Sequence, residues 1–529
     1  MKTTTNLQRR KLLKYAALGI AGAVTSPASA KPGGFVRVNA PSAGFYPDVE
    51  IDLIQNTAEA AIFPGETTRI WKITGKVIKG PSGVLDNNEG TYLAPTLRFK
   101  KGQKVRLTLN NNLPAQSILH WHGLHVPANM DGNPMYAINQ GETYVYEFEI
   151  LNRAGTYFYH AHTHSVTARQ VYSGLAGLLI VSDDQEQALN LPSGDLDVPL
   201  VIQDRSFDDQ NQLLYSAHMM QRMQGFLGDR IMVNGRPDYV LPVATRAYRL
   251  RLVNGSNSRI YKLAWDDDTP LTVIGVDGGL LEKPEQHAYV MLAPGERLEV
   301  WMDFSKRAPG AELSLRSLKF DIAAHGGMGM MGMGMMRGGM MAVSSLPSGS
   351  DYPLLKIRVA KKEQGHNILP EVLTPITALQ VKHAENAANP RTIALSMQHM
   401  SALLNGRSYK MNDIQPDEII PVNSLQLIEF DNGFDGGMQG MMMSMPHPMH
   451  VHGEQFQIVK REVNLRFNDS RASVASGFIQ SGWKDTVLVM PGEKVTILKP
   501  FNDFKGLFMY HCHNLEHEDL GMMRDFLIK

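Results

Sequence analysis

Cysteine is almost absent from this chain, since Cys512 is the only one in 529 residues. It has no partner for a disulfide within the chain, which excludes a disulfide-stapled fold. The chain also lacks an excess of charge of either sign, since it has 52 basic and 52 acidic residues. This balance predicts no nucleic-acid partner. After the N-terminal segment no apolar run is long enough to span a bilayer, so we expect no stable membrane anchor.

The N-terminal segment has the organisation of an export signal. The basic run Gln8-Arg9-Arg10-Lys11 precedes an apolar stretch at 15–24 and the small residues Ala28-Ser29-Ala30. This pattern is similar to a twin-arginine signal, and a plain secretory signal is the alternative. We therefore expect 1–30 to be a signal peptide, the twin-arginine export machinery to be a partner, and the location to be periplasmic.

One short phrase occurs three times, as a Gly-Glu turn that opens a strand of alternating residues. The copies begin at Gly141, Gly295 and Gly492. In the first and third copies a His-X-His pair starts 18 residues after the glutamate, at His160 and His511, and the second copy lacks such a pair. Repeated phrases of this kind indicate three related domains.

The spacing of short strands and of Gly, Pro and Asn turns is typical of β-sandwiches. The sequence therefore predicts an all-β chain of three sandwich domains, with helix sparse and strongest at 216–224. The predicted segments are domain 1 at 45–185, domain 2 at 194–345, a linker at 346–389 and domain 3 at 390–529.

Histidines gather in four segments of the first and third predicted domains. These segments are His120-Trp121-His122, His160-Ala161-His162, His447-Pro448-Met449-His450-Val451-His452, and His511-Cys512-His513 with His517. Alternation along a strand aims both rings of a His-X-His pair at one site. A single pair would be read as hydrogen-bonding histidines, but four segments at matching places predict one shared metal site between the two domains.

Cys512 lies on the opposite strand face from His511 and His513. Together with His517 and Met522 it supplies three of the four ligands of a blue copper site, which uses two histidines, one cysteine and a weak axial methionine. His447 differs in parity from His450 and His452, so it completes the set.

These four motifs together resemble the multicopper oxidase family over essentially the whole mature chain. The resemblance implies three cupredoxin-like Greek-key β-sandwich domains, four copper ions, and a trinuclear cluster between domains 1 and 3, with no copper ligand in domain 2. It assigns a type 1 copper to His447, Cys512, His517 and Met522, a type 2 copper to His120 and His450, one type 3 copper to His122, His160 and His513, and the other type 3 copper to His162, His452 and His511.

The resemblance also implies a reaction, in which dioxygen is reduced to water with four electrons. Cys512 would receive electrons one at a time, and the peptide on either side would lead to His511 and His513. Asp131 and Glu518 match the family's acidic residues for proton delivery, although either could be a structural hydrogen-bonding carboxylate.

Methionine, with 30 residues, is unusually frequent and gathers in two places. The glycine-rich loop 325–341 has neither helical nor strand periodicity and ends domain 2. Thioethers select Cu(I), and the candidate ligands for a labile substrate copper are Met328, Met330, Met331, Met333, Met335, Met336, Met340, Met341, Met443 and Met445. The alternatives for the loop are a linker or an oxidant trap, but the second cluster directly before His447 favours a route for cuprous ions.

The resemblance is strongest to bacterial periplasmic cuprous oxidases of copper tolerance. In those enzymes the substrate copper also uses an aspartate where this chain has Met443, and Asp431, Asp435 or Asp519 would have to compensate. We therefore expect a monomeric enzyme that oxidises Cu(I) or a small reductant with dioxygen. A laccase acting on phenols is the alternative enzyme, and a copper-sequestering protein is the non-enzymatic one; complete ligands argue against a scaffold, and the type 3 pair argues against a nitrite reductase.

Overall fold

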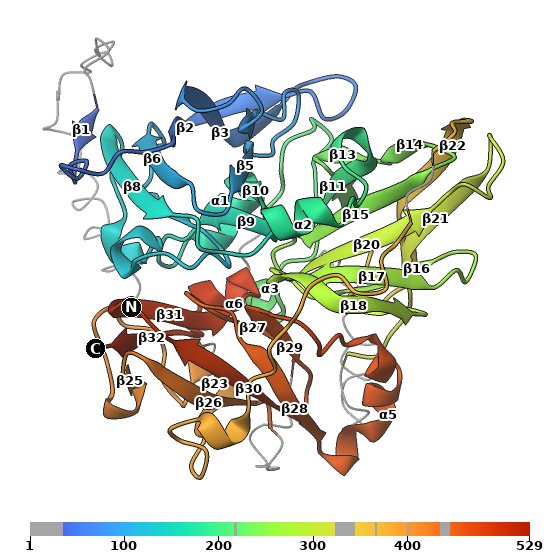
Figure 1. Ribbon diagram of the computed structural model, residues 1–529. Coiled ribbons are helices and arrows are strands. Elements are labelled where there is room, and N and C mark those ends of the chain that lie inside the picture. The colour runs from blue at the N-terminus through green and yellow to red at the C-terminus, as the bar shows by residue number, and fades with distance from the viewer. Residues whose placement is uncertain (1–34, 216–218, 323–343, 366–367, 399–400, 434–444) are drawn as a thin grey trace, which may run out of the picture. The chain divides into compact units, whose positions relative to one another are not determined.

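The computed structural model describes residues 35–215, 219–322, 344–365, 368–398, 401–433 and 445–529. The predicted signal peptide, the loop 325–341, Asp435 and Met443 lie outside these residues. Contacts divide the chain into Met1–Val36 and Arg37–Lys529, and β1 (Val36–Arg37) straddles that division. All that follows concerns the second unit, in which strands dominate (Figure 1).

Six sheets form three consecutive pairs along the chain. The first pair contains β8 (Glu142–Glu149), β6 (Lys104–Asn111), β2 (Val49–Ala60) and β3 (Thr68–Lys79) in one sheet, and β4 (Leu85–Asp86), β5 (Thr96–Lys100), β10 (Ala176–Ser182), β9 (Gly155–Ala161) and β7 (Leu119–His120) in the other. Along β2, Val49, Ile51 and Leu53 are buried and their neighbours are partly exposed, so the period-2 pattern builds one face of the core.

The second pair extends further along the chain than the sequence predicts. One sheet contains β13 (Arg236–Pro237), β12 (Arg230–Val233), β11 (Asp197–Arg205), β15 (Ala247–Asn254), β20 (Arg297–Asp303), β17 (Leu271–Val276) and β18 (Gly279–His287), and the other contains β14 (Val240–Ala244), β22 (Tyr352–Lys361), β21 (Glu312–Ser317), β16 (Tyr261–Trp265) and β19 (Val290–Leu292). β22 falls inside the stretch assigned to the linker, yet it pairs with both β14 and β21. Lys356 and Arg358 interrupt its hydrophobic residues, so the sequence pattern did not predict a strand in this segment.

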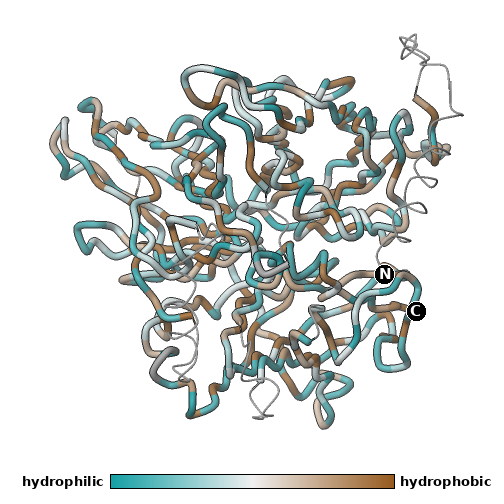
Figure 2. Tube along the Cα trace, turned by 180° about the vertical axis from the view of Figure 1, so that it is seen from behind, coloured by the Kyte–Doolittle hydropathy of each residue, from teal (hydrophilic) through white to brown (hydrophobic). Residues whose placement is uncertain are grey.

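The third pair completes the molecule. It contains β24 (Ser401–Leu404), β23 (Arg391–Gln398), β26 (Ser424–Asp431), β30 (Glu493–Phe501) and β28 (Gln457–Val463) in one sheet, and β25 (Ile419–Ile420), β32 (Met523–Ile528), β31 (Gly506–Cys512), β27 (His447–Val451) and β29 (Thr486–Val489) in the other. Each pair of sheets encloses its own hydrophobic cluster, which confirms three β-sandwiches. Figure 2 shows hydrophobic and hydrophilic segments interspersed along the chain trace.

The repeated phrase has the same place in each sandwich. The strand after the Gly-Glu turn pairs antiparallel with an earlier strand, as β8 with β6, β20 with β15 and β30 with β26. That earlier strand also pairs in parallel with a strand that precedes it in the chain, as β6 with β2, β15 with β11 and β26 with β23. The repeat therefore corresponds to a common strand order.

Helices are short and few in the part of the chain that the structure describes. They are α1 (Thr167–Ser173), α2 (Asp184–Ala188), α3 (Met219–Gln224), α5 (Asn468–Ala472) and α6 (Leu515–Asp519), with 3-10 turns at Ala128–Met130, Pro134–Tyr136, Gly194–Leu196, Val381–His383, Pro416–Glu418, Leu465–Phe467 and Ala475–Gly477. None of the described helices is long and apolar enough to cross a membrane. α3 falls within the predicted helix 216–224.

Candidate metal centre

Two strand pairs place histidines opposite one another in the first and third sandwiches. On β7 and β9, His120 is the register partner of His160, and on β27 and β31, His450 is the partner of His511. The same local arrangement therefore occurs once in each of the two sandwiches, and the described residues of the second sandwich include none of the predicted histidine or cysteine ligands.

Eight imidazoles from these sandwiches converge on one buried region. Their Nε2 atoms approach across the interface, at 3.3 Å between His120 and His450, 3.2 Å between His162 and His511, and 3.4 Å between His160 and His513. All eight side chains are at most 3% exposed. Three-residue groups within ligand range include His122, His160 and His513, and also His162, His452 and His511, the same groups that the sequence analysis drew.

The protonation state of these imidazoles suits metal binding. Burial first, and then the neighbouring imidazoles, hold the pKa well below its usual value for His122, His160, His162, His450, His452 and His513. A neutral ring keeps a lone pair for a metal ion. The Nδ1 atoms of His122, His162 and His513 are buried without a hydrogen-bond partner. This donor set fits copper, which imidazole nitrogen binds readily.

Cys512 forms a second donor set, 5 residues before His517 in the chain. Its Sγ lies 3.4 Å from His447 Nδ1 and 3.7 Å from His517 Nδ1, and the two nitrogens are 3.3 Å apart. A triangle of this size has its centre about 2 Å from each corner, a usual distance for a metal ligand. Met522 is fully buried, and its carbonyl accepts a hydrogen bond from Cys512 N at 3.0 Å.

A segment that precedes β12 of the second sandwich covers Cys512, His447 and His517. His517 Nε2 lies 3.1 Å from the backbone carbonyl of Met223 on α3, which is the acceptor when the nitrogen is protonated. The carboxylate of Glu516 accepts hydrogen bonds from Tyr215 Oη at 3.0 Å and Phe226 N at 3.0 Å, on either side of α3. Cys512, His447 and His517 are consequently at most 1% exposed.

Carboxylates contact the outer nitrogens of the converging histidines. Asp131 Oδ2 lies 2.6 Å from His452 Nδ1, and Glu518 Oε2 lies 3.2 Å from His511 Nδ1. Both carboxylates are at most 2% exposed. Asp485 and the hydroxyl of Thr486, at 3.0 and 3.1 Å from His122 Nε2, were not predicted, because a carboxylate beside a threonine has no distinguishing sequence pattern.

The remaining candidates have other partners or lie outside the described residues. Of the substrate-copper candidates, only Met445 falls within them. Asp519 accepts the backbone N–H groups of Thr167 and Ala168 at 2.9 and 3.1 Å, and Asp431 forms an ion pair with Lys494 at 3.4 Å. The structure therefore brings together the histidines, Cys512, Asp131 and Glu518, and among the residues that it describes no aspartate is identified for a substrate copper; Asp435 lies outside them.

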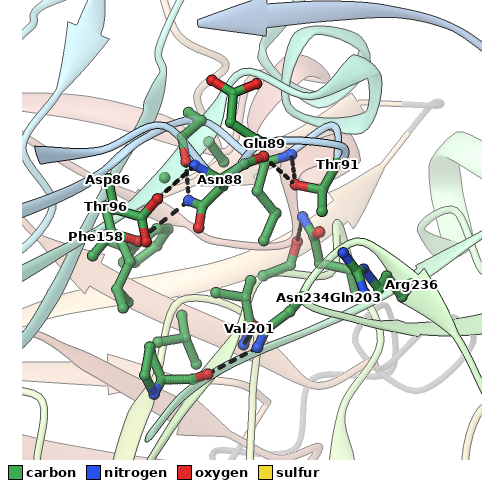
Figure 3. Close-up of a pocket in the computed structure, with 18 of the residues that line it drawn as sticks. Asp86, Asn88, Glu89, Thr91, Thr96, Phe158, Val201, Gln203, Asn234 and Arg236 are labelled. Atoms are coloured by element: carbon green, nitrogen blue, oxygen red, sulfur yellow. Dashed lines mark hydrogen bonds between the residues drawn. The ribbon is translucent and has the colours of Figure 1, made fainter. Parts of the chain in front are cut away.

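A cavity of about 400 Å³ lies between the first and second sandwiches (Figure 3). Asn88, Glu89, Gln203 and Arg236 line it, and none of the predicted ligands does. Phe158, another lining residue, packs on His122 with ring centroids 4.4 Å apart. The cavity is thus separated from the converging histidines by an aromatic ring.

Known proteins are similar to this chain in both sequence and fold. Family models described as multicopper oxidase match residues 74–186 and 377–529. The multicopper oxidase mco of Staphylococcus aureus is 32% identical over 436 residues, which cover 82% of this chain and 81% of the relative.

Two solved structures extend the likeness to the whole fold. The McoA multicopper oxidase of the hyperthermophile Aquifex aeolicus matches with a TM-score of 0.73 and 30% identity, covering 94% of this chain and 98% of that one. The laccase-like multi-copper oxidase CueO of the lignin-degrading bacterium Ochrobactrum sp., described with oxidase activity towards lignin model compounds and lignosulfonate, matches with a TM-score of 0.71 and 28% identity, covering 94% of this chain and 100% of that one.

Proposed function

The chain belongs to the multicopper oxidase family, and on this premise we propose that it oxidises Cu(I) with dioxygen in periplasmic copper detoxification. The family membership itself makes it an oxidase with cupredoxin-like domains that uses copper, a reductant and oxygen. The identity of the reductant and the cellular role are the proposal.

Four copper ions would be held by the two donor sets. We assign the type 1 copper to His447, Cys512, His517 and Met522, the type 2 copper to His120 and His450, and the type 3 pair to His122, His160 and His513 on one side and His162, His452 and His511 on the other. Copper, when bound, changes between Cu(I) and Cu(II) and so supplies the one-electron steps that the reduction of dioxygen requires. The convergence of neutral, buried ring nitrogens supports this assignment.

The chain itself connects the two copper sites. Cys512 is bonded through the backbone to His511 and His513, whose rings join the converging histidines while the Cys512 thiol joins His447 and His517. Asp131 and Glu518 are the proposed proton-delivery carboxylates, since each lies within 3.2 Å of an outer imidazole nitrogen. We also propose domain boundaries at 45–185, 194–361 and 390–529, with the second domain extended to include β22.

The covering of the type 1 ligands is the observation that carries the choice of substrate. His517 Nε2 lies against the carbonyl of Met223, so the segment formed by α3 with Tyr215 and Phe226 beside it covers the ligands. A phenol would have to displace this segment, whereas Cu(I) needs only thioethers near the site. Met445 lies two residues before His447, and Met443 with the methionines of 328–341 would complete a labile substrate site.

Oxidation of phenols as a laccase is the second candidate, favoured by the likeness to the Ochrobactrum enzyme. A copper-sequestering protein would bind the same ions without consuming oxygen. Oxygen consumption with Cu(I) and with a phenol, before and after deletion of residues 328–341, distinguishes the three. A matched variant with leucine for every methionine of the loop keeps its length and apolar character.

We expect both loop variants to lose most of the Cu(I)-supported rate and to keep or raise the phenol-supported rate. An unchanged Cu(I) rate in both would contradict the cuprous proposal. If the Cu(I)-supported rate fell in the deletion variant but not in the leucine variant, the effect would come from loop length, which would count against Cu(I) binding by thioethers. If the copper-loaded protein consumed no oxygen with either reductant, the copper-sequestering function would be the alternative that is supported.

The proposal includes export as a folded monomer through the twin-arginine route. Replacement of Arg9 and Arg10 by lysine should retain the protein in the cytoplasm, and fractionation of cells measures this. Unchanged periplasmic recovery would contradict the route.

A further inference from the structure

The second domain contributes none of the ligands proposed for the type 1, type 2 and type 3 coppers, yet one of its turns lies against His513. Gly295 adopts a positive φ of 84°, and a Cβ there would lie 2.9 Å from Cγ of His513. Two residues later, Arg297 begins β20 and is 1% exposed. The repeated Gly-Glu phrase therefore has a different use in domain 2, where it packs against the cluster rather than preceding a His-X-His pair.

Arg297 is held by all three domains. Its five N–H donors each have an acceptor: Thr156 O at 3.0 Å in domain 1, Gly295 O at 3.0 Å and Asp277 O at 2.9 Å in domain 2, and Asp485 Oδ1 at 2.6 Å and Oδ2 at 2.5 Å in domain 3. The two bonds to Asp485 form the planar, bidentate pairing that lysine cannot reproduce.

Asp485 transmits this arrangement to a proposed ligand. Its Oδ1 lies 3.0 Å from His122 Nε2 and also accepts the hydroxyl of Thr486 at 3.0 Å. A carboxylate at Nε2 keeps the proton on that nitrogen, which leaves the lone pair on Nδ1. His122 Nδ1 has no other partner and is buried. Gly123 makes room for this contact, because a Cβ there would meet Asp485 Oδ2 at 2.4 Å and Arg297 Nη2 at 2.6 Å.

We propose that Arg297 is a positioning residue for the type 3 copper site: it orients Asp485, and Asp485 sets the ring orientation and tautomer of His122. The inference rests on the proposed copper assignment. It gives domain 2 a role in the oxygen-reducing centre, since the site forms in its binding geometry only when all three domains are docked around Arg297.

The test titrates copper into the metal-free protein and follows the type 1 and type 3 absorption bands separately, with bound copper per chain as the second readout. The variants are Arg297→Lys and Asp485→Asn. Arg259→Lys is the matched control, because Arg259 is also fully buried in domain 2, pairs with Asp204 at 2.8 Å, and has no hydrogen bond or ion pair to a proposed ligand. Thermal unfolding of each metal-free protein measures the general loss of stability.

We expect Arg297→Lys and Asp485→Asn to weaken type 3 copper binding about 10- to 100-fold, as loss of such outer partners does, with the blue type 1 band retained. Arg259→Lys should lower the unfolding midpoint without this selective loss. Unchanged type 3 affinity in Asp485→Asn, the variant of nearly identical shape, would overturn the inference even if Arg297→Lys fails to fold. Equal loss in the control would also overturn it, whereas a wild-type protein that binds no type 3 pair would remove the proposed function itself.

Discussion

At the scale of single residues, the chemistry depends on Cys512 and on the alternation of its neighbours. Burial raises the pKa of the Cys512 thiol, so the thiolate needs a nearby cation to form. The two imidazoles within 3.7 Å of Sγ, His447 and His517, are neutral, because burial lowers the pKa of His517 to about 4 and that of His447 well below its usual value. A metal ion is therefore the cation that fits.

Cys512→Ser should remove the blue colour and abolish turnover, because the type 1 site loses its thiolate. Serine is close in shape, so the type 3 band and the copper bound by the histidines should remain. Visible absorption and oxygen consumption measure both effects. Retention of the blue band in this variant would show that the colour comes from a different site.

Asp131→Asn and Glu518→Gln should lower kcat about 100-fold or more with little change in KM, because positioned proton donors contribute about 10²–10⁴ to rate. Asp503→Asn is the matched control, since Asp503 pairs with His125 at 2.7 Å on the surface. Steady-state oxygen consumption gives both parameters. Equal rates in all variants would make the two buried carboxylates structural.

Residue patterns indicated which side chains converge, but not the residues that hold them in place. The His-X-His pairs and Cys512 can be recognised from the sequence because alternate residues of a strand point to the same side, which requires no knowledge of the tertiary structure. The contact of Arg297 with Asp485 joins residues 188 positions apart, and no local pattern marks either one. Partners of this kind are set by how domains dock.

At the scale of elements, matching strand pairs carry histidines proposed as ligands, and a short helix covers one proposed site. The predicted Gly-Glu strands became β8, β20 and β30, because alternating residues form one buried face. β22 was missed because Lys356 and Arg358 interrupt its apolar residues. α3 was anticipated, but its position over His517 follows from hydrogen bonds to Glu516 and could not be predicted.

Tyr215→Phe should loosen the segment over the type 1 ligands, because it removes the hydrogen bond from Tyr215 Oη to Glu516. Such a bond contributes about 1 kcal/mol, which corresponds to roughly fivefold more of the open form. Oxidation of a phenol should rise by up to that factor while the blue band is kept. Tyr144→Phe, which removes a bond to Asn129 O in domain 1, should leave the phenol rate unchanged.

At the scale of the whole molecule, buried polar networks cross the domain boundaries: Arg297 of domain 2 pairs with Asp485 of domain 3, and an ion-pair network in domain 2 is bonded to domain 1. Glu299 in domain 2 accepts hydrogen bonds from Arg249 at 2.5 Å and Arg251 at 2.8 Å, and from Thr156 Oγ1 of domain 1 at 2.6 Å. Burial opposes ionisation of Glu299, but the two arginines lower its pKa to about 2 on balance. Removal of one partner from such a network costs about 3–5 kcal/mol.

This network predicts a specific dependence of stability on pH. Because the folded pKa of Glu299 is below its ordinary value of 4.5, its ionised form stabilises the protein above that pH, and the contribution is lost as the pH falls towards 2. The contribution is about 3 kcal/mol. Glu299→Gln should therefore unfold more readily at neutral pH and show a smaller further loss in acid.

Unfolding midpoints of the metal-free protein across this pH range test the prediction. Glu312→Gln is the control, since Glu312 forms exposed ion pairs with Lys356 and Arg358 and should change little. Parallel acid curves for Glu299→Gln and the wild-type protein would contradict it.

The anomalous scattering of copper in crystals of the loaded protein tests the central claim most directly, because it locates each ion. We predict four peaks, one within the triangle of Cys512, His447 and His517, and three among the eight histidines shared by domains 1 and 3. Peaks elsewhere, with none between those two domains, would contradict the account.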